Sequence, residues 1–200
     1  MSQLRPKDED GFINTLEFSL KGQRPYVRGI DIVRSFQLAT GITAARFVFR
    51  KSLRFQARLV EGQDPNAATH IETAAGARFS LVATDNRAKR STAEPPPMHS
   101  TFLVRLGSLY VLASPRPMCV VDMIDHFFER VQQYMPSRHI VTAIQFHPLT
   151  TPYICFIWSR LQRGADMERL ALATSRGLAA QIEFQVFKRP GRTGAAKGRR

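Results

Sequence analysis

Two aspartates and one histidine are the residues of this chain whose type and spacing could support chemistry. Asp31 and Asp122 each open an apolar pattern that is typical of a helix, and His126 follows Asp122 by four residues, so these two share one helix face. Carboxylate and imidazole groups can transfer protons near neutral pH. The plainer interpretation is that the aspartates are helix-start residues favoured by the dipole, and that His126 is structural.

Other recognisable sites are absent from the sequence. It contains no glycine-rich phosphate loop, no zinc-ligand spacing and no nucleophile elbow, so we expect no metal site. Cys119 and Cys155 lie in apolar runs, which predicts buried thiols in a reducing compartment. No signal segment opens the sequence, and no apolar run approaches the ~18 residues of a membrane span. We therefore expect a cytoplasmic protein that does not enter a membrane.

The chain of 200 residues is strongly basic, with a formal net charge of +13. This charge admits a polyanionic partner, which could be nucleic acid, an acidic carrier protein or a phosphorylated cofactor. Part of the charge lies in residues 189–200, which we expect to form a disordered tail whose alternative role is to aid solubility. Apolar residues make up 44% of the chain, enough for a real core.

The first predicted elements are those that would position Asp31. Residues 1–11 are polar and are expected to be disordered. Phe12 to Leu20 alternates between apolar and polar residues, as a strand does. Apolar residues at positions 32, 33 and 36 then predict a short helix that ends at Gly41.

Alternation returns after this helix. Thr43 to Leu59 is predicted to be a long strand or a hairpin, and His70 to Thr84 a further hairpin with its tip near Gly76. In the first of these stretches the apolar residues fall on odd positions. The even positions carry a row of arginines, which predicts one exposed basic face: Arg46, Arg50, Arg54 and Arg58.

The second half repeats this order of elements after a predicted linker at residues 87–99, which is poor in apolar residues and contains three consecutive prolines. A hairpin is predicted around Gly107-Ser108, and apolar spacing predicts a helix from Val120 to Tyr134. The remaining predicted strands are residues 140–146, residues 153–158 and a last hairpin at residues 170–187.

Three landmarks recur in the same order: Asp31 with Asp122, Thr43-Ala44 with Thr142-Ala143, and Thr73 to Gly76 with Thr174 to Gly177. Their separations are 91, 99 and 101 positions. The increase predicts a second helix that is longer by eight residues, about two turns, which preserves the buried face. The period suits two domain-sized halves rather than a solenoid, although matches this short also arise by chance.

The predicted order of elements resembles the hot-dog fold, in which a curled sheet wraps a central helix. This order is a strand, a turn, a helix and a run of antiparallel strands that ends in a hairpin. The second half resembles it most, and the first half is similar with a shorter helix. The tandem pair resembles the double hot-dog arrangement of thioesterases, hydroxyacyl dehydratases and hydratases. The predicted fold class is therefore α+β, with tandem hot-dog-like units at residues 12–86 and 100–188.

In that family the pantetheine arm of an acyl thioester lies between two units, with its carbonyl at the N-terminus of a central helix. The resemblance implies that Asp31, Asp122 or His126, with Asp125 beside them, transfers protons or activates water. Coenzyme A or phosphopantetheine would be part of the substrate, with no bound cofactor. The candidate substrate-binding residues are Tyr26, Arg28, Gly29, Arg46 and Arg50, of which the last two could dock an acidic carrier or the phosphates of coenzyme A.

The sequence departs from the family in two ways: it lacks the histidine loop of the dehydratases, and no histidine stands beside Asp31. The predicted function is processing or binding of acyl-CoA or acyl-carrier thioesters in lipid or polyketide-type metabolism, by a thioester hydrolase or dehydratase if the protein is an enzyme. One alternative is a non-catalytic assembly protein of the same fold. Another is a nucleic-acid binder, which the absence of a helix-turn-helix or RNA-binding signature disfavours. The candidate partners are an acidic acyl-carrier protein and a second copy of the chain.

Overall fold

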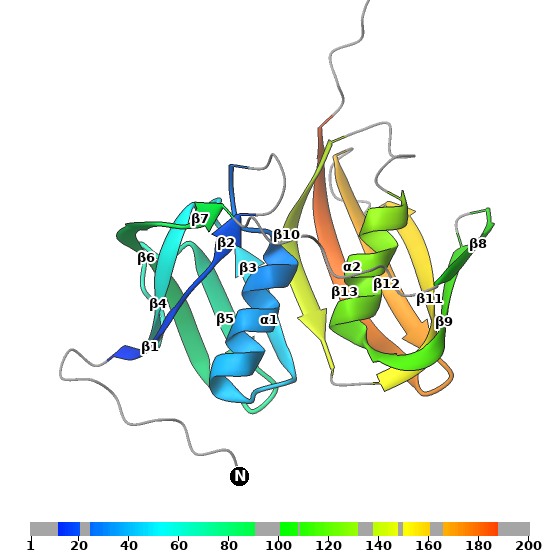
Figure 1. Cartoon of the computed structure of the whole chain (residues 1–200), viewed down its shortest axis with the longest axis horizontal. Coiled ribbons are helices and arrows are strands. Elements are labelled where there is room, and N and C mark those ends of the chain that lie inside the picture. Colours follow the sequence, from blue (N-terminus) through cyan, green and yellow to red (C-terminus); the bar gives the residue numbers. More distant parts are fainter. Residues whose placement is uncertain are drawn as a thin grey trace, which may run out of the picture.

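One large antiparallel sheet organises the chain (Figure 1). The computed structural model describes residues 12–20, 25–90, 101–107, 109–131, 138–147, 150–160 and 166–187. Across these residues the sheet has eleven strands, accompanied by a separate two-stranded sheet and two helices. Within the same residues no helix is long and apolar enough to cross a membrane.

The first half contributes β1 (Phe12–Leu16), β2 (Ser19–Leu20), α1 (Gly29–Thr40), β3 (Ala45–Phe49), β4 (Phe55–Glu61), β5 (Thr69–Thr73), β6 (Arg78–Arg87) and β7 (Lys89–Arg90). The second half contributes β8 (Phe102–Leu106), β9 (Leu109–Cys119), α2 (Val120–Val131), β10 (Arg138–Phe146), β11 (Thr150–Arg160), β12 (Met167–Thr174) and β13 (Gly177–Phe187).

The strand order across the large sheet is β1-β4-β6-β5-β3-β10-β13-β12-β11-β9-β8. Strands of the first half therefore occupy one side of the sheet and strands of the second half the other, and the two sides meet where β3 pairs with β10. The predicted combination of a mostly antiparallel sheet with two helices is confirmed. The halves are not identical in strand order, because β3 lies next to β5 whereas β10 lies next to β13. The second half also contributes β8 as an additional strand at its end of the sheet.

Several predicted strands are revised by the pairing. The stretch from Thr43 to Leu59 is neither one strand nor a hairpin, because β3 pairs with β5 and β10 while β4 pairs with β1 and β6. The arginine row within it is exposed, as predicted. Of the predicted linker, Arg87 ends β6 and β7 pairs with β2, while residues 91–99 lie outside the described residues. The predicted tail and residues 1–11 also lie outside them.

Helix α1 forms where the apolar spacing predicts it. Ile32, Val33 and Phe36 fall on one face and are buried. The helix ends because Gly41 adopts a left-handed conformation, with φ of 71°, and donates its N–H to the carbonyl of Gln37 at 2.8 Å. A left-handed residue closes a helix at little cost only when it has no Cβ.

Helix α2 has the same length as α1 in the residues described: each has 12 residues, and both bounds of α2 stand 91 positions after those of α1. The prediction of a helix eight residues longer is therefore not seen up to Val131, and its continuation to Tyr134 falls among residues outside the description. The buried face of α2 comprises Val120, Val121, Met123, Ile124, Phe127 and Val131.

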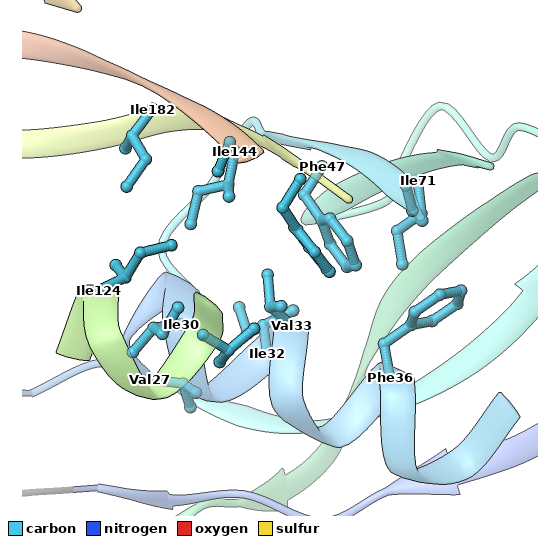
Figure 2. Close-up of a cluster of buried hydrophobic side chains, with 14 of the residues drawn as sticks. Val27, Ile30, Ile32, Val33, Phe36, Phe47, Ile71, Ile124, Ile144 and Ile182 are labelled. Carbon is cyan, nitrogen blue, oxygen red and sulfur yellow. The ribbon is translucent and has the colours of Figure 1, made fainter. Parts of the chain in front are cut away.

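The core runs continuously across the joint between β3 and β10. Phe47 pairs with Ile144 in the sheet, and Figure 2 shows both facing the helix side chains Val33 and Ile124. The rings of Phe47 and Phe146 stack with centroids 5.7 Å apart and planes within 16°. Both side chains are at most 1% exposed, so the two halves of the sheet share one apolar core.

Replacing Phe146 by alanine is expected to lower the free energy of unfolding by about 3–5 kcal/mol, because it opens a cavity at this joint and removes the ring contact. Chemical denaturation measures the loss. Leu38→Ala, at an 82% exposed position of α1, is the control and should change stability by less than about 0.5 kcal/mol. Equal effects of the two substitutions would contradict a shared core at the joint.

Candidate functional site

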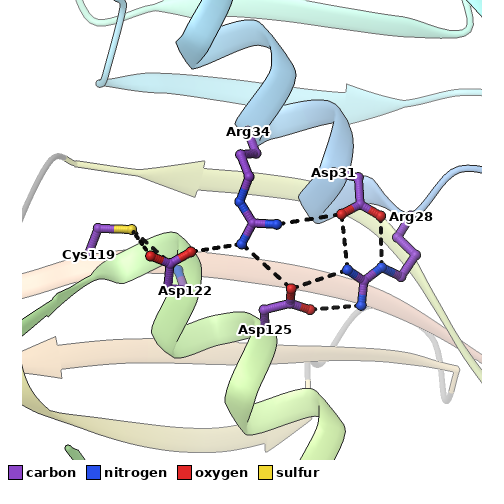
Figure 3. A network of polar contacts seen from close by, with 6 residues as sticks. All are labelled: Arg28, Asp31, Arg34, Cys119, Asp122 and Asp125. Atoms are coloured by element: carbon purple, nitrogen blue, oxygen red, sulfur yellow. Dashed lines mark hydrogen bonds and ion pairs between the residues drawn. The ribbon is translucent and has the colours of Figure 1, made fainter. Parts of the chain in front are cut away.

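The two predicted catalytic aspartates lie in one polar network between the helices (Figure 3). Arg28 and Arg34 come from the start of α1 together with Asp31, and Asp122 and Asp125 come from the first half of α2. The sequence of each helix places these residues three apart, so they follow one face. Two guanidinium groups thus face three carboxylates across the contact between α1 and α2.

Arg28 bridges the helices from the position just before α1. Its Nε and Nη2 donate to the two carboxylate oxygens of Asp31 at 2.8 and 3.0 Å, and its Nη1 and Nη2 donate to those of Asp125 at 2.8 and 3.1 Å. The three side chains are 16% exposed or less. This fork geometry gives strong, charge-assisted hydrogen bonds in a largely water-excluded place.

Arg34 completes the network about one turn after Asp31 on α1. Its Nη2 donates to Asp122 Oδ1 at 2.8 Å and lies 3.5 Å from Asp125 Oδ2, and its Nη1 lies 3.6 Å from Asp31 Oδ1. This end of the network is more open to solvent, since the side chain of Arg34 is 33% exposed and that of Asp122 is 44% exposed. Each of the three carboxylates therefore has at least one arginine partner.

The network favours the charged forms of Arg28 and Asp122. Burial opposes the charged form of Arg28, but the hydrogen bond to Asp31 and the charges of Asp125 and Asp31 outweigh it and raise its pKa. Burial likewise acts against the charge of Asp122, yet hydrogen bonds from Cys119 and Arg34, the charge of Arg34 and the nearby His126 lower its pKa. A carboxylate with a lowered pKa is a weak proton acceptor, which argues against Asp122 as a general base in this arrangement.

Cys119 lies at the end of β9, directly before α2, and is exposed, so the prediction of a buried thiol there is wrong. Cys155 is partly buried. The Cys119 Sγ donates a hydrogen bond to Asp122 Oδ2 at 3.0 Å. Burial of part of the thiol and its bond to Asp122 raise the pKa of Cys119, which keeps it protonated and makes it a poor nucleophile.

Part of the network is repeated on the two helices. Adding the helix separation of 91 positions matches Arg28 with Cys119, Asp31 with Asp122, and Arg34 with Asp125. The contact from Arg28 to Asp31 on one helix is repeated by the contact from Cys119 to Asp122 on the other. The ion pair between Arg34 and Asp125 joins the two matched positions directly.

The remaining candidates lie at the start of α1 and on α2. Gly29 is the first residue of the helix, and a Cβ on it would lie 3.1 Å from Cζ of Phe49, so only glycine fits beneath this ring without displacing it. Tyr26 is half-buried three residues before Gly29. His126 is half-buried on α2, one turn after Asp122.

Arg46 and Arg50 do not join this group. Phe47 faces α1, with its ring centroid 5.3 Å from that of Phe36, so the neighbouring Arg46 points to the opposite face of the sheet. Arg50 lies with Nη1 3.1 Å from Nε2 of His70, on an exposed part of the chain. The predicted binding residues thus divide between two faces.

The sequence reasoning missed Arg34 and Phe49. Arg34 follows Asp31 by three residues, a spacing that places both on one helix face and could have identified it. No local signal marks Phe49, because its contact with Gly29 depends on how β3 packs against α1. Among the described residues, no group of three or more histidine, cysteine or acidic side chains could hold a metal ion.

No family model matches the chain, and no curated protein matches it in sequence. Its structure is similar to solved ones. A hot-dog protein of unknown function from Alicyclobacillus acidocaldarius is 10% identical, with a TM-score of 0.44 and coverage of 84% of this chain and 89% of that one. The tesB protein of Mycobacterium avium subsp. paratuberculosis is 6% identical, with a TM-score of 0.45 and coverage of 85% and 91%. The 12:0-ACP thioesterase of Umbellularia californica is 9% identical, with a TM-score of 0.44 and coverage of 88% and 96%.

Replacing Arg28 by glutamine is expected to lower the free energy of unfolding by about 3 kcal/mol, because it leaves the carboxylates of Asp31 and Asp125 buried without their main partner. Arg46→Gln, on the exposed face, is the matched control and should cost less than about 0.5 kcal/mol. Urea denaturation at pH 7 compares the two variants. A loss at Arg28 no larger than at Arg46 would contradict a stabilising network.

The lowered pKa of Asp122 predicts a pH dependence of stability. The folded-state pKa lies below the unfolded value of about 4, so the stabilisation by ionised Asp122 is present above pH ~4 and is lost as pH falls through the folded-state value. The difference in unfolding free energy between wild type and Asp122→Asn should therefore shrink below pH ~4. Asp85→Asn, on an exposed part of β6, controls for loss of one carboxylate. A difference that stays constant down to pH ~2.5 would refute this assignment.

Proposed function

We propose that this protein is a tandem hot-dog protein that binds acyl thioesters at the joint between its halves. Three features support two units related by an approximate two-fold axis: helices of equal length at a constant separation, the matched ion-pair positions, and the stacking of Phe47 on Phe146, which stand at corresponding places in the repeat. The units would span residues 12–86 and 100–188.

The start of α1 is the observation that carries the proposal. Here Gly29 directly follows Arg28 and lies beneath the ring of Phe49, three residues after half-buried Tyr26. Arg28 makes the contact with the second helix. The first N–H groups of a helix have no partners within it and, with the dipole, can polarise a carbonyl oxygen. An acyl thioester whose carbonyl reached Gly29 would meet these groups beside an aromatic wall.

The network gives this helix start a fixed position. Arg28 holds the first turn of α1 against Asp125 of α2, so the N–H groups near Gly29 are held relative to the second helix. A thioester hydrolase or a dehydratase would in addition need a proton acceptor. His126, half-buried on α2 one turn after Asp122, is the candidate from this helix.

A non-catalytic hot-dog assembly protein is the second candidate function. It is favoured by the engagement of Asp31 and Asp122 with arginines, which leaves neither carboxylate as a ready base. Under either function, coenzyme A or phosphopantetheine belongs to the bound molecule. An acidic acyl carrier could dock on the exposed arginine face, where Arg46 and Arg50 lie away from Gly29.

The test uses a panel of acyl-CoA thioesters. Calorimetry measures their binding, and the release of free thiol measures their turnover. We expect binding of at least one acyl-CoA, and Gly29→Val should weaken it at least tenfold, because the added methyl groups displace Phe49. Ala39→Val, in the last turn of the same helix, is the control for added bulk and should leave binding unchanged. The proposal would be overturned if no thioester binds, whether it is carried by free CoA or by a carrier protein.

Turnover separates the two candidates. If the protein is an enzyme, Asp31→Asn, Asp122→Asn or His126→Gln should lower thiol release or dehydration at least tenfold while thioester binding persists, and Asp85→Asn should not. Binding without any turnover identifies the non-catalytic function.

A further inference from the structure

β8 ends the large sheet opposite β1, at the far right of Figure 1. In the part of the chain that the structure describes, β8 pairs with β9 along one edge, and no strand pairs with its other edge. An open edge presents N–H and C=O groups that can bond to another strand. We propose that β8 is a docking edge for the β8 strand of a second copy of the chain, paired antiparallel across a two-fold axis at Val104. The proposal goes beyond thioester binding and does not depend on it.

The outer face of β8 is apolar. Phe102, Val104 and Leu106 alternate along the strand and are 67%, 53% and 63% exposed. The row continues across the sheet, since Leu106 pairs with Leu109 and Leu109 with Ile157, which is also exposed. Natural edge strands are usually blunted by a charge, a proline or a bulge, and this face of β8 has none of them.

The free hydrogen-bonding groups of β8 lie at the right positions for this pairing. Residues 107 and 108 join β8 to β9, and Leu106 and Leu109 form the closing pair. In an antiparallel hairpin with a two-residue connection the closing pair is hydrogen-bonded, and bonding alternates along the strands. Phe102, Val104 and Leu106 therefore bond to β9, whereas Leu103 and Arg105 turn their N–H and C=O groups to the open edge.

The strand is complementary to itself about Val104. In the proposed register Val104 lies opposite its own copy, Leu103 opposite Arg105, and Phe102 opposite Leu106. The pairs of Leu103 with Arg105 are the hydrogen-bonded ones, which matches the groups that face outward. On the apolar face, Phe102 would cover Leu106 of the other copy on both sides of the axis, as an isologous interface requires.

The chemistry of the edge favours a second copy over a polyanion. Its one basic side chain, Arg105, lies on the other face and is already engaged, with Nε donating to the carbonyl of Gly107 at 3.1 Å and the guanidinium 5.5 Å from the ring centroid of Tyr110. The exposed parts of the three apolar side chains come to on the order of 300 Å² per copy. With the backbone edge, this is the size of a transient dimer.

Net charge gives the pairing a characteristic salt dependence. Each copy carries a formal charge of +13, so two copies repel one another at low ionic strength. Added salt screens this repulsion and strengthens the apolar contact, so dimerisation should tighten as salt rises. Binding of a polyanion to the arginine face would weaken over the same range.

Sedimentation of the full chain tests the dimer. We expect a monomer–dimer equilibrium with a dissociation constant on the order of 10–100 µM, at least threefold tighter at 500 mM than at 50 mM NaCl. Val104→Lys should weaken it at least tenfold, because two lysines would meet on the axis, whereas Leu38→Lys on α1 should not. A monomer up to ~1 mM, or a dimer that Val104→Lys leaves intact, overturns the proposal. A dimer that appears only after removal of residues 189–200 also overturns it, since the tail would then be the occupant.

Disulfide trapping tests the register without relying on affinity. In a Cys119→Ser background, Val104→Cys should cross-link two copies, because facing residues of a non-bonded antiparallel pair have Cα atoms about 4.5 Å apart, within disulfide range. Leu106→Cys is the matched control, equally exposed on the same face, but about 14 Å from its own copy in this register. We expect cross-linking at position 104 to be at least tenfold faster. Equal rates would refute the two-fold axis at Val104.

Discussion

The antiparallel pairing of β3 with β10 is the interaction on which the rest of the structure depends. It turns two groups of strands into one sheet and brings Phe47 and Phe146 into contact from opposite halves. Once these strands are in register, α1 and α2 must lie side by side over the same apolar face. The polar contact between the helices is thus a consequence of pairing between the strands that follow them, β3 after α1 and β10 after α2.

Burying the guanidinium of Arg28 and the carboxylates of Asp31 and Asp125 between the helices is costly unless their hydrogen bonds are satisfied. Here the forked guanidinium of Arg28 serves a carboxylate on each helix, and Arg34 reaches all three. The apolar core defines which faces meet, but apolar contacts tolerate sliding. Charged groups with directional bonds restrict the helices to one axial and rotational position, which is what a binding site at the start of α1 would need.

The sequence alone predicted much of the secondary structure, for identifiable reasons. Apolar spacing located both helices, Gly41 marked the end of α1, and the turn residues at Gly76 and Gly177 marked two hairpins. The sequence did not predict that β3 pairs with β10 and not with β4. Alternation of apolar and polar residues indicates which face of a strand is buried, but it does not indicate which strand is adjacent. For the same reason it identified Asp31 and Asp122 separately. The spacing of three residues could have linked Arg34 to Asp31, but its contact with Asp122 depends on how the two helices are placed together.

Opposite charges at matched helix positions have a consequence for which halves can associate. Arg34 and Asp125 occupy equivalent positions on the two helices. Two first halves paired in this geometry would therefore place arginine against arginine at the centre. Two second halves would place four carboxylates together with no arginine of the network to pair with them. The unlike couple comes nearest to neutrality, with two arginines facing three carboxylates. The charge distribution therefore favours the same pairing of unlike halves that the covalent connection enforces. Association of either half with a second copy of itself would be opposed by repulsion.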